Sequence, residues 1–352
     1  MPLHHQLRSP LVLIFAAFFA VLTFWNFFLK RDRIGFFWQR TEEKLPETRH
    51  FVLPDQRQIA YGIYGAHNAT STVFYFHGSP SSHHEAFVLS GAGRRHGIRI
   101  IAPSRPGSGG STFRDNGAIL DYPDDILALA DYLNVTQFGI IAVSGGTPYG
   151  FACLRRIPPT RIQGFGVVAG LYPVTSLGTE GMKWPSRIML KVATWFPGLV
   201  AWVIDKQFGS VARDEDESKL EALLEADMKQ DSTPESERLA WEAASPEIRK
   251  AVVMSVREGV RYGGWGPAWE MKLLGSDWGF ELDDIQPDED NELVMWHGDL
   301  DTNVPLTMAQ KAAARLGIHA ELRVIPDQGH GSLTFQKADE IVGAMKGMAW
   351  RS

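Results

Sequence analysis

The sequence predicts a protein of the α/β class, in which a mostly parallel, eight-stranded sheet carries helices on both faces. From about residue 48, short runs of β-forming residues alternate with turns and helical stretches, and this alternation is typical of parallel sheets with helical crossovers. The runs at 73–76 and 139–143 are continuously apolar, as in strands that are buried on both faces. No comparable run occurs from about 171 to 291, which predicts a helical insertion.

The composition limits the classes of function. With 352 residues, 44% of them hydrophobic, the chain can bury one large core with an insertion or at most two modest domains. The net charge of −6 is spread along the chain without a block of Lys and Arg, which argues against a nucleic-acid partner. The single cysteine, Cys153, falls in an apolar helical pattern, and we interpret it as a packing residue. No metal-ligand spacing or phosphate-binding loop occurs, so no metal or cofactor is predicted.

An apolar segment precedes the predicted domain. After a tail at 1–10, residues 11–29 read LVLIFAAFFAVLTFWNFFL and carry no charge. A helix of this length spans about 28 Å, close to the hydrocarbon thickness of a bilayer. A cleaved signal peptide is the main alternative, but it needs a small-x-small cleavage site that this segment lacks. A buried soluble helix is disfavoured because the segment is apolar all round. We predict a single-pass membrane anchor at 11–29.

The charges beside this segment predict its orientation. Basic residues follow it in the juxtamembrane linker at 30–47, whereas only Arg8 and the terminal amine precede it; those that follow are Lys30, Arg31, Arg33 and Arg40. The positive-inside rule therefore places the main domain on the cytoplasmic side. Two glycosylation sequons, at Asn68 and Asn134, would matter only on the luminal side.

The elements of the domain follow in a regular order. The first two strands form a predicted hairpin around Pro54-Asp55, and an amphipathic helix is predicted at 121–133. These elements divide the domain into a first core part at 48–170, a helical lid at 171–290 and a second core part at 291–352. The predicted strands are residues 49–53, 58–64, 72–76, 98–102, 138–143, 165–169, 293–296 and 321–325.

Helical signals fill the predicted lid. Ser245 is an N-cap followed by proline at the first helical position, and this helix ends at Gly263-Gly264. The stretch Ser218-Lys-Leu-Glu221 resembles a capping box. We interpret the lid tryptophans as its own core, beside a pocket with an apolar lining. They are seven of the eleven in the chain: Trp184, Trp195, Trp202, Trp241, Trp265, Trp269 and Trp278.

A candidate nucleophile lies directly after the fifth predicted strand. The chain there reads Ala-Val-Ser-Gly-Gly around Ser144, a form of the sharp strand-to-helix turn that exposes a nucleophilic hydroxyl. The backbone of such a turn is strained and neighbouring chain passes close by, so Ala142 and Gly146 must be small. Because a serine hydroxyl is a poor nucleophile, it also needs an imidazole and an acid that orients it.

Both partners occur after later strands. Asp299 and Asp301 follow the strand at 293–296, and His330 follows the strand at 321–325. Because the carboxyl ends of parallel strands meet at one edge of a sheet, these groups can converge on Ser144. The other polar residues receive simpler interpretations. His77 and His297 are scaffold residues; His83, His84 and His96 lie at the surface or the pocket rim; Arg105 braces its loop or binds a substrate carboxylate.

From residue 48 to its end, the chain resembles the α/β-hydrolase superfamily, in particular its lidded serine esterases. The resemblance is carried by motifs in the expected order: His77-Gly78-Ser79-Pro80, Arg105-Pro-Gly-Ser-Gly-Gly-Ser111, Val143-Ser-Gly-Gly146, Gly298-x-x-Asp301-x-x-Val304-Pro305 and Gly329-His330. The His-Gly-x-Pro loop is also typical of the epoxide-hydrolase and dehalogenase branch. That branch uses an aspartate nucleophile, so Ser144 argues against both of those activities.

The resemblance implies a nucleophile at Ser144, an acid at Asp301 rather than Asp299, and a base at His330. The backbone N–H groups of Ser79 and Gly145 would form the oxyanion hole. We therefore expect a membrane-anchored serine hydrolase that cleaves an ester or thioester of a lipophilic small molecule. The alternatives are an acyltransferase or natural-product tailoring enzyme that uses the same triad, and a non-catalytic, membrane-tethered binding protein of the same fold.

Overall fold

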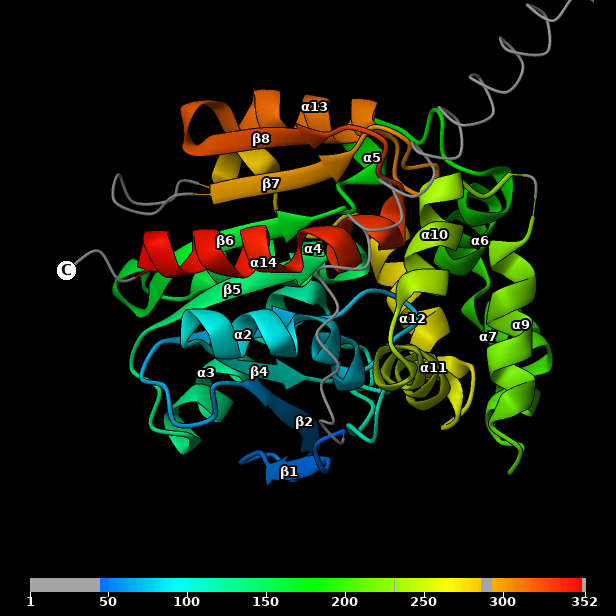
Figure 1. The fold of residues 1–352 in the computed structure, drawn as a ribbon, viewed down its shortest axis with the longest axis horizontal. Helices are drawn as coiled ribbons and strands as arrows, with labels where there is room; N and C mark the ends of the chain where they lie inside the picture. The colour runs from blue at the N-terminus through cyan, green and yellow to red at the C-terminus, as the bar shows by residue number, and fades with distance from the viewer. Residues whose placement is uncertain (1–44, 231, 286–292, 350–352) are drawn as a thin grey trace, which may run out of the picture.

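The computed structural model describes residues 45–230, 232–285 and 293–349. In this part of the chain, eight strands form one sheet in the order β1-β2-β4-β3-β5-β6-β7-β8 (Figure 1). The strands are β1 (Arg49–Val52), β2 (Gln58–Gly65), β3 (Thr72–Phe76), β4 (Arg99–Pro103), β5 (Phe138–Val143), β6 (Ile162–Val168), β7 (Leu293–Gly298) and β8 (Ala320–Ile325).

The sheet is mostly parallel, as predicted. β1 and β2 form the expected antiparallel hairpin, and β2 is also antiparallel to β4. The remaining neighbours pair in parallel, with β3 and β5 side by side at the centre. Every residue of these two central strands is buried, which explains why their sequences are continuously apolar.

Two hydrophobic cores lie on opposite faces of the sheet. Phe74 and Phe76 of β3 belong to one core, whereas Val73 and Tyr75 belong to the other, because successive side chains of a strand point to opposite faces. The first core is covered by α3 (Tyr122–Tyr132), α4 (Thr147–Arg156) and α13 (Leu306–Leu316). The second is covered by η1 (His83–Leu89), α2 (Ser90–His96) and α14 (His330–Ala349).

The chain between β6 and β7, called the helical insertion below, contributes helices beyond the carboxyl ends of the parallel strands (Figure 1). The lid predicted at 171–290 falls in this part of the chain, of which residues 286–290 are outside the described ranges. Its α-helices are α5 (Val174–Leu177), α6 (Trp184–Trp195), α7 (Pro197–Ile204), α8 (Ser210–Ala212), α9 (Ser218–Met228), α10 (Glu235–Ala243), α11 (Pro246–Val260) and α12 (Trp265–Gly275). Short helical turns are η2 (Ile119–Asp121), η3 (Ser144–Gly146), η4 (Pro159–Arg161), η5 (Asp205–Gly209), η6 (Leu282–Asp284) and η7 (Gly317–His319).

One of the two predicted caps in the insertion is confirmed. The Ser245 side chain accepts a hydrogen bond from the backbone N–H of Ile248 and so caps α11. The capping box predicted at Ser218 is wrong. Ser218 is the first residue of α9, and its hydroxyl donates to the carboxylate of Asp216 over 2.6 Å. A capping box needs the serine at the N-cap position, which Glu217 occupies instead.

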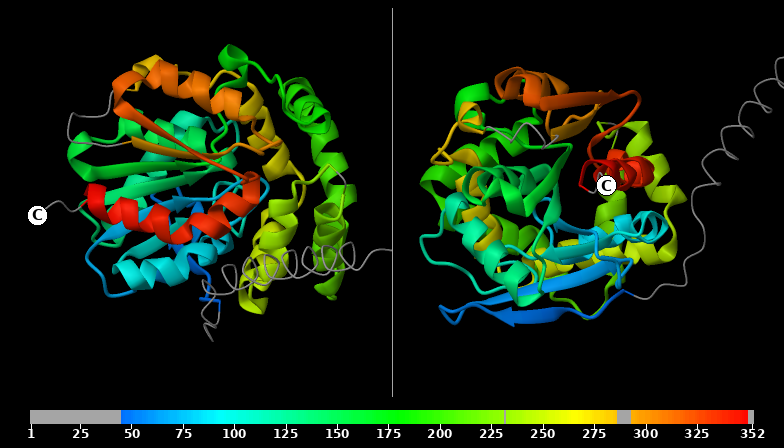
Figure 2. Two further views of the ribbon diagram at one scale, coloured as in Figure 1. Left: turned by 45° about the horizontal axis from the view of Figure 1, so that its top comes forward. Right: turned by 90° about the vertical axis from the view of Figure 1, so that its left-hand side faces the viewer.

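The interpretation of the tryptophans as the core of the insertion is wrong for four of the seven. Trp184 and Trp195 of α6, Trp202 of α7 and Trp265 of α12 are exposed, whereas Trp241 and Trp278 are buried. In Figure 2, α6 and α7, drawn in green, lie at the outer margin of the insertion. Their outward faces therefore have no protein layer to pack against in the described part of the chain.

The predicted membrane anchor at 11–29 lies outside the described residues, as do residues 30–44 of the predicted linker. Among the residues that the structure does describe, no helix is both long enough and apolar enough to cross a bilayer.

Candidate active site

Ser144 lies at a tight turn between β5 and α4. Its φ is +49°, in the left-handed region that is unfavourable for a residue with a side chain. The turn fits only because its neighbours are small. A Cβ atom added to Gly146 would lie 2.3 Å from the carbonyl oxygen of Phe76, so the glycine is required there. This geometry agrees with the reasoning from sequence, and it exposes the hydroxyl of Ser144 at the end of the central strand.

His330 is the first residue of α14, on the chain that leaves β8. Its Nε2 atom lies 2.8 Å from Oγ of Ser144, and its Nδ1 atom lies 2.7 Å from Oδ2 of Asp301. With the Nδ1 proton donated to Asp301, Nε2 is free to accept the hydroxyl proton of Ser144. The structure thus brings together the three residues that the sequence predicts as nucleophile, base and acid.

Asp301 is the aspartate that reaches His330. It is buried, and its Oδ1 atom accepts hydrogen bonds from the backbone N–H groups of Asn303 and Val304 at 2.9 Å each. Burial raises the pKa of this carboxyl, but the neighbouring imidazole of His330 and these hydrogen bonds outweigh it and hold the pKa below the usual value. Asp299 is exposed. The geometry therefore agrees with the choice of Asp301 over Asp299.

Three carboxylates act on His330 from different elements. Burial lowers its pKa, but the charge and hydrogen bond of Asp301 oppose this effect, helped by the charges of Glu237 on α10 and Glu85 on η1. The net result is a raised pKa. His297, behind Asp301 on β7, is itself held neutral because burial lowers its pKa. The site therefore favours the imidazolium that forms when His330 takes a proton.

The predicted oxyanion-hole residues lie side by side beside Ser144. A Cβ atom added to Gly145 would lie 2.9 Å from Cβ of Ser79 and 3.5 Å from its backbone nitrogen. A Cβ added to Gly78 would lie 3.6 Å from Cβ of Ser144. The loop after β3 and the turn after β5 therefore approach closely, and at Gly145 there is no room for a side chain. Two backbone N–H groups at this contact could stabilise an oxyanion.

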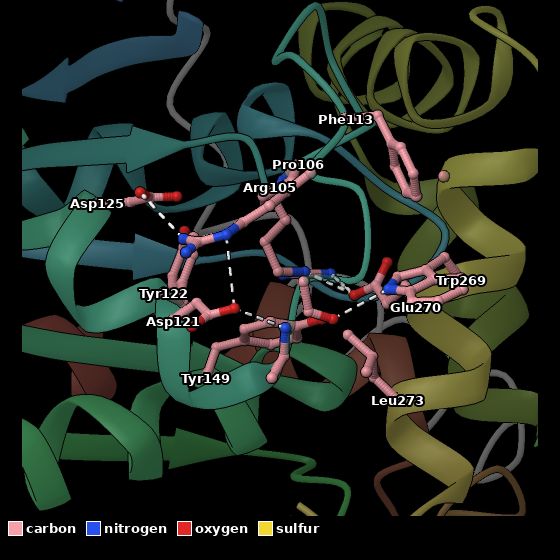
Figure 3. Close-up of a pocket in the computed structure, with 14 residues that line it drawn as sticks. Arg105, Pro106, Phe113, Asp121, Tyr122, Asp125, Tyr149, Trp269, Glu270 and Leu273 are labelled. Carbon is pink, nitrogen blue, oxygen red and sulfur yellow. Dashed lines mark hydrogen bonds and ion pairs between the residues drawn. The ribbon is translucent and has the colours of Figure 1, made fainter. Parts of the chain in front are cut away.

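A buried ion pair braces the loop that carries Ser79. Arg105 donates hydrogen bonds to the carbonyl oxygens of His77 and Gly78, and its Nε atom lies 2.6 Å from Oε1 of Glu270 on α12. The second oxygen of Glu270 accepts from the hydroxyl of Ser79. Figure 3 shows the guanidinium facing this carboxylate beside Tyr149. This contact agrees with the bracing role predicted for Arg105, and it occupies the carboxylate-binding groups of the side chain.

A second carboxylate beside this loop, the half-buried Glu85, was missed by the sequence reasoning. It accepts hydrogen bonds from the backbone N–H of Gly78 and from the hydroxyls of Tyr75 and Ser81. Ser81 also contacts Ser255 of α11. The loop at 78–81 is therefore held by Glu85 from the core, and by Ser255 and Glu270 from the helical insertion.

Glu237 of α10 was missed as well. Its carboxylate accepts hydrogen bonds from the backbone N–H groups of Gly331 (2.8 Å) and Ser332 (2.9 Å). These groups are unpaired donors at the N-terminus of α14, directly after His330. A carboxylate at this position caps the helix and faces the positive end of its dipole. No local motif indicates this contact, because the two elements are about 95 residues apart in sequence.

The predicted roles of the other histidines are partly corrected. His77 and His297 are buried and hydrogen-bonded to the carbonyl oxygens of Gly78 and Val304, as expected for scaffold residues. His83 and His84, expected at the surface or the pocket rim, are buried instead. The reason is that η1 turns its polar side chains inward. His83 there bonds to the hydroxyls of Ser104 and Thr48.

A cavity of about 230 Å³ opens in front of Ser144 and His330. The helical insertion and α14 supply most of its apolar wall, and among the described residues that line it the acidic side chains are Glu85 and Glu237. The apolar side chains are Val88, Val143, Leu224, Met228, Ala240, Trp241, Val252, Val256 and Phe335. Of the tryptophans in the insertion, only Trp241 lines this cavity in the described structure.

No group of three or more His, Cys, Asp or Glu residues in the described ranges is arranged to hold a metal ion. Cys153 is buried in the first core, where burial raises the pKa of its thiol. It packs as predicted.

Comparisons with known proteins agree with this fold. Residues 73–344 match the alpha/beta hydrolase family. Solved structures with a similar fold include an esterase (EaEST) from Exiguobacterium antarcticum, with 14% identity and a TM-score of 0.57 over 86% of this chain and 98% of that chain. A putative aryl esterase from Burkholderia cenocepacia has 14% identity and a TM-score of 0.58 over 86% and 97%. The epoxide hydrolase CorEH has 15% identity and a TM-score of 0.58 over 85% and 97%. No curated protein matches the sequence significantly.

The family match covers most of the chain. The chain therefore belongs to the alpha/beta hydrolase family, and the protein is a hydrolase.

Proposed function

We propose that this protein is a serine hydrolase that cleaves an ester or thioester of a lipophilic small molecule. The observation that carries the proposal is the unbroken hydrogen-bonded series from Ser144 through His330 to Asp301. The strained backbone at Ser144 supports it further, because strain of this kind is concentrated at functional sites.

The proposed reaction has two stages. His330 removes the proton of Ser144 as the hydroxyl oxygen attacks the carbonyl carbon of the substrate, and the imidazolium is stabilised by Asp301. The N–H groups of Ser79 and Gly145 donate hydrogen bonds to the negatively charged carbonyl oxygen. His330 then gives its proton to the departing alcohol or thiol, which leaves an acyl group on Ser144. A water molecule, deprotonated by His330, hydrolyses this acyl-enzyme.

The cavity supports a lipophilic acyl group of limited size. Its volume of about 230 Å³ has room for roughly eight groups of the size of a water molecule. A methylene group has nearly the same volume, so an acyl chain of roughly eight carbons would fill the cavity. The apolar wall favours such a chain, and the carboxylates of Glu85 and Glu237 disfavour an acyl chain that ends in an anion.

The proposal includes attachment to a membrane through residues 11–29, with the domain on the cytoplasmic side. It is supported by the length and uncharged composition of this segment and by the basic residues that follow it. A lipophilic substrate is also most concentrated in or near a bilayer.

The proposed activity is tested with a series of p-nitrophenyl esters of increasing acyl length. We expect the rate to increase up to roughly eight carbons, the length that fills the cavity, and to fall for longer chains. Ser144→Ala should lower the rate by up to about 10⁶-fold, as in other serine hydrolases that lose their nucleophile. Ser210→Ala, which changes an exposed serine of α8, is the control. Equal rates in the Ser144→Ala variant and the native protein would exclude the proposed nucleophile.

A further inference from the structure

The outer side of α6 and α7 exposes a continuous series of large apolar side chains. They recur at helical spacing and therefore share one face of the two consecutive helices. We call this surface the α6–α7 face. It consists of Trp184 (71% exposed), Ile188 (50%), Trp195 (77%), Phe196 (65%), Leu199 (54%) and Trp202 (59%). Single exposed apolar residues are common, but a contiguous group of this kind marks a surface that contacts another apolar phase.

The opposite side of the same helices is firmly packed. Ala193, Val200 and Ile204 are buried against α11 and α12. The backbones approach closely at two glycines of α12: a Cβ atom added to Gly264 would lie 2.1 Å from the carbonyl oxygen of Ala201, and one added to Gly275 would lie 2.7 Å from that of Leu190. This packing fixes the rotation of α6 and α7, so the tryptophans cannot turn inward.

The charges on this part of the chain are all positive. From residue 183 to residue 204 the charged residues are Lys183, Arg187 and Lys191, and no acid occurs. This is unusual in a chain with a net charge of −6, and it contrasts with 214–227, where seven acids accompany a single lysine. The basic residues therefore lie on α6 or directly before it, on the same helix as Trp184 and Trp195.

Tryptophan with basic residues on a fixed helical face matches the interface of a lipid bilayer. Indole rings combine an apolar body with a polar N–H group and settle at the level of the lipid headgroups. Lysine and arginine beside them attract anionic lipids. The apolar segment at 11–29 of the same chain predicts a bilayer nearby, so a bilayer rather than a protein partner is the expected occupant of this face.

We propose that the α6–α7 face is a membrane-docking surface that rests on a bilayer containing anionic lipids. The proposal rests on the membrane attachment proposed above, because residues 11–29 would hold the domain beside such a bilayer. Docking through α6 and α7 would give the helical insertion a defined orientation towards the lipid.

The single cysteine makes a site-specific test possible. Cys153 is buried and its thiol has a raised pKa, so it does not compete for a thiol-reactive dye. The variants Ile188→Cys and Leu199→Cys place an environment-sensitive fluorophore on the α6–α7 face. Ile318→Cys, at an isoleucine that is 97% exposed between α13 and β8, is the matched control. The full-length protein is reconstituted into vesicles of phosphatidylcholine with phosphatidylserine, with and without brominated acyl chains.

Docking predicts that the dyes at 188 and 199 emit at shorter wavelength in vesicles and lose fluorescence to brominated lipid, while the dye at 318 does neither. If all three dyes behave as in water, the proposal is wrong. A blue shift at 188 and 199 without quenching by brominated lipid also contradicts it, because the face would then be covered by protein, either a second copy or another segment of this chain.

The contribution of the basic residues to docking is tested separately. Replacing Arg187 and Lys191 by Glu should reduce the blue shift and the quenching of the dye at 199 in vesicles with phosphatidylserine. An unchanged signal would overturn the requirement for anionic lipids. Ester hydrolysis and resistance to carbonate extraction, measured on the same vesicles, report separately on the proposed activity and on the anchor. A loss of docking can therefore be distinguished from a loss of the proposed activity and from a loss of the anchor.

Discussion

Asp301 is the residue whose contacts fix the orientation of the imidazole. Its two oxygens are divided between His330 and the backbone N–H groups that follow Asp301 in its own loop. Asp301→Asn would place an amide where a carboxylate accepts the Nδ1 proton, so His330 would adopt the wrong tautomer. We expect kcat to fall by roughly 10⁴-fold, as in other triads, and Asp299→Asn to change it little. Steady-state ester hydrolysis measures both variants. The opposite ranking would assign the acid to Asp299.

The raised pKa of His330 has a measurable consequence. His330 must be neutral to take the proton of Ser144, so the activity is lost as the pH falls through its pKa. Because Asp301, Glu237 and Glu85 raise this pKa above its ordinary value of 6.5, the acid limb of kcat/KM should lie above pH 6.5. A pH profile of ester hydrolysis gives the value. An acid limb clearly below 6.5 would contradict this electrostatic account.

Glu237 should influence this profile from the helical insertion. In Glu237→Gln the negative charge is lost and only one oxygen remains to accept from Gly331 and Ser332. The acid limb should therefore move to lower pH, by less than in Asp301→Asn, because Asp301 contributes more to the raised pKa. Glu242→Gln, at an exposed position of the same helix, should leave the limb in place. Identical profiles for the two variants would show that Glu237 acts only on structure.

Residues were predictable where the local sequence itself determines the geometry. The turn at Ser144 needs Gly146, and the ends of two strands, β7 and β8, supply Asp301 and His330, so short motifs indicate all three. Glu85 binds residues 4 to 10 positions away, and no short motif indicates these contacts. Glu237 and Glu270 could not be found in this way, because each binds groups far away in sequence. Their partners depend on how the helical insertion packs on the sheet.

At the scale of elements, the Arg105–Glu270 pair joins α12 to the loops that follow β3 and β4. Glu270→Gln would leave the buried guanidinium without its counter-charge. Removal of one partner from a buried pair costs about 3–5 kcal/mol of folding free energy. Removal of Asp205 from its exposed pair with Arg213 should cost at most about 1 kcal/mol. Chemical unfolding of Glu270→Gln and Asp205→Asn compares the two. Equal losses would mean that the buried pair does not brace the fold.

The strands were predicted more accurately than the helices of the insertion. The predicted ends of all eight strands lie within a few residues of the observed ones, because continuous apolar runs such as 138–143 have few other ways to be buried. In the insertion, the local sequence signals predict the structure less reliably. The hydroxyl of Ser218 donates to the carboxylate of Asp216 instead of capping the helix, and Trp184 and Trp195 lie on the outside. A periodic apolar face looks the same in sequence whether protein or another phase covers it.

At the scale of the whole molecule, the described residues bury both faces of the sheet in two hydrophobic cores. Deletion of residues 1–34 should therefore release a soluble domain that keeps its reactivity towards a fluorophosphonate. Through the α6–α7 face it should still bind anionic vesicles, in a salt-sensitive way. Sedimentation with and without vesicles measures both properties. An insoluble or inert truncated protein would mean that the N-terminal segment is part of the fold.

Activation of Ser144 by His330 and Asp301 is tested by mass spectrometry of the full-length protein after reaction with a fluorophosphonate. If these residues activate Ser144 as a nucleophile, a single adduct forms on the peptide that contains Ser144. The adduct is absent from Ser144→Ala and forms far more slowly in Asp301→Asn. An adduct on another residue, or equal labelling of Ser144→Ala, would contradict the proposed mechanism. No adduct on the folded protein would point to a binding protein that keeps the fold without turnover.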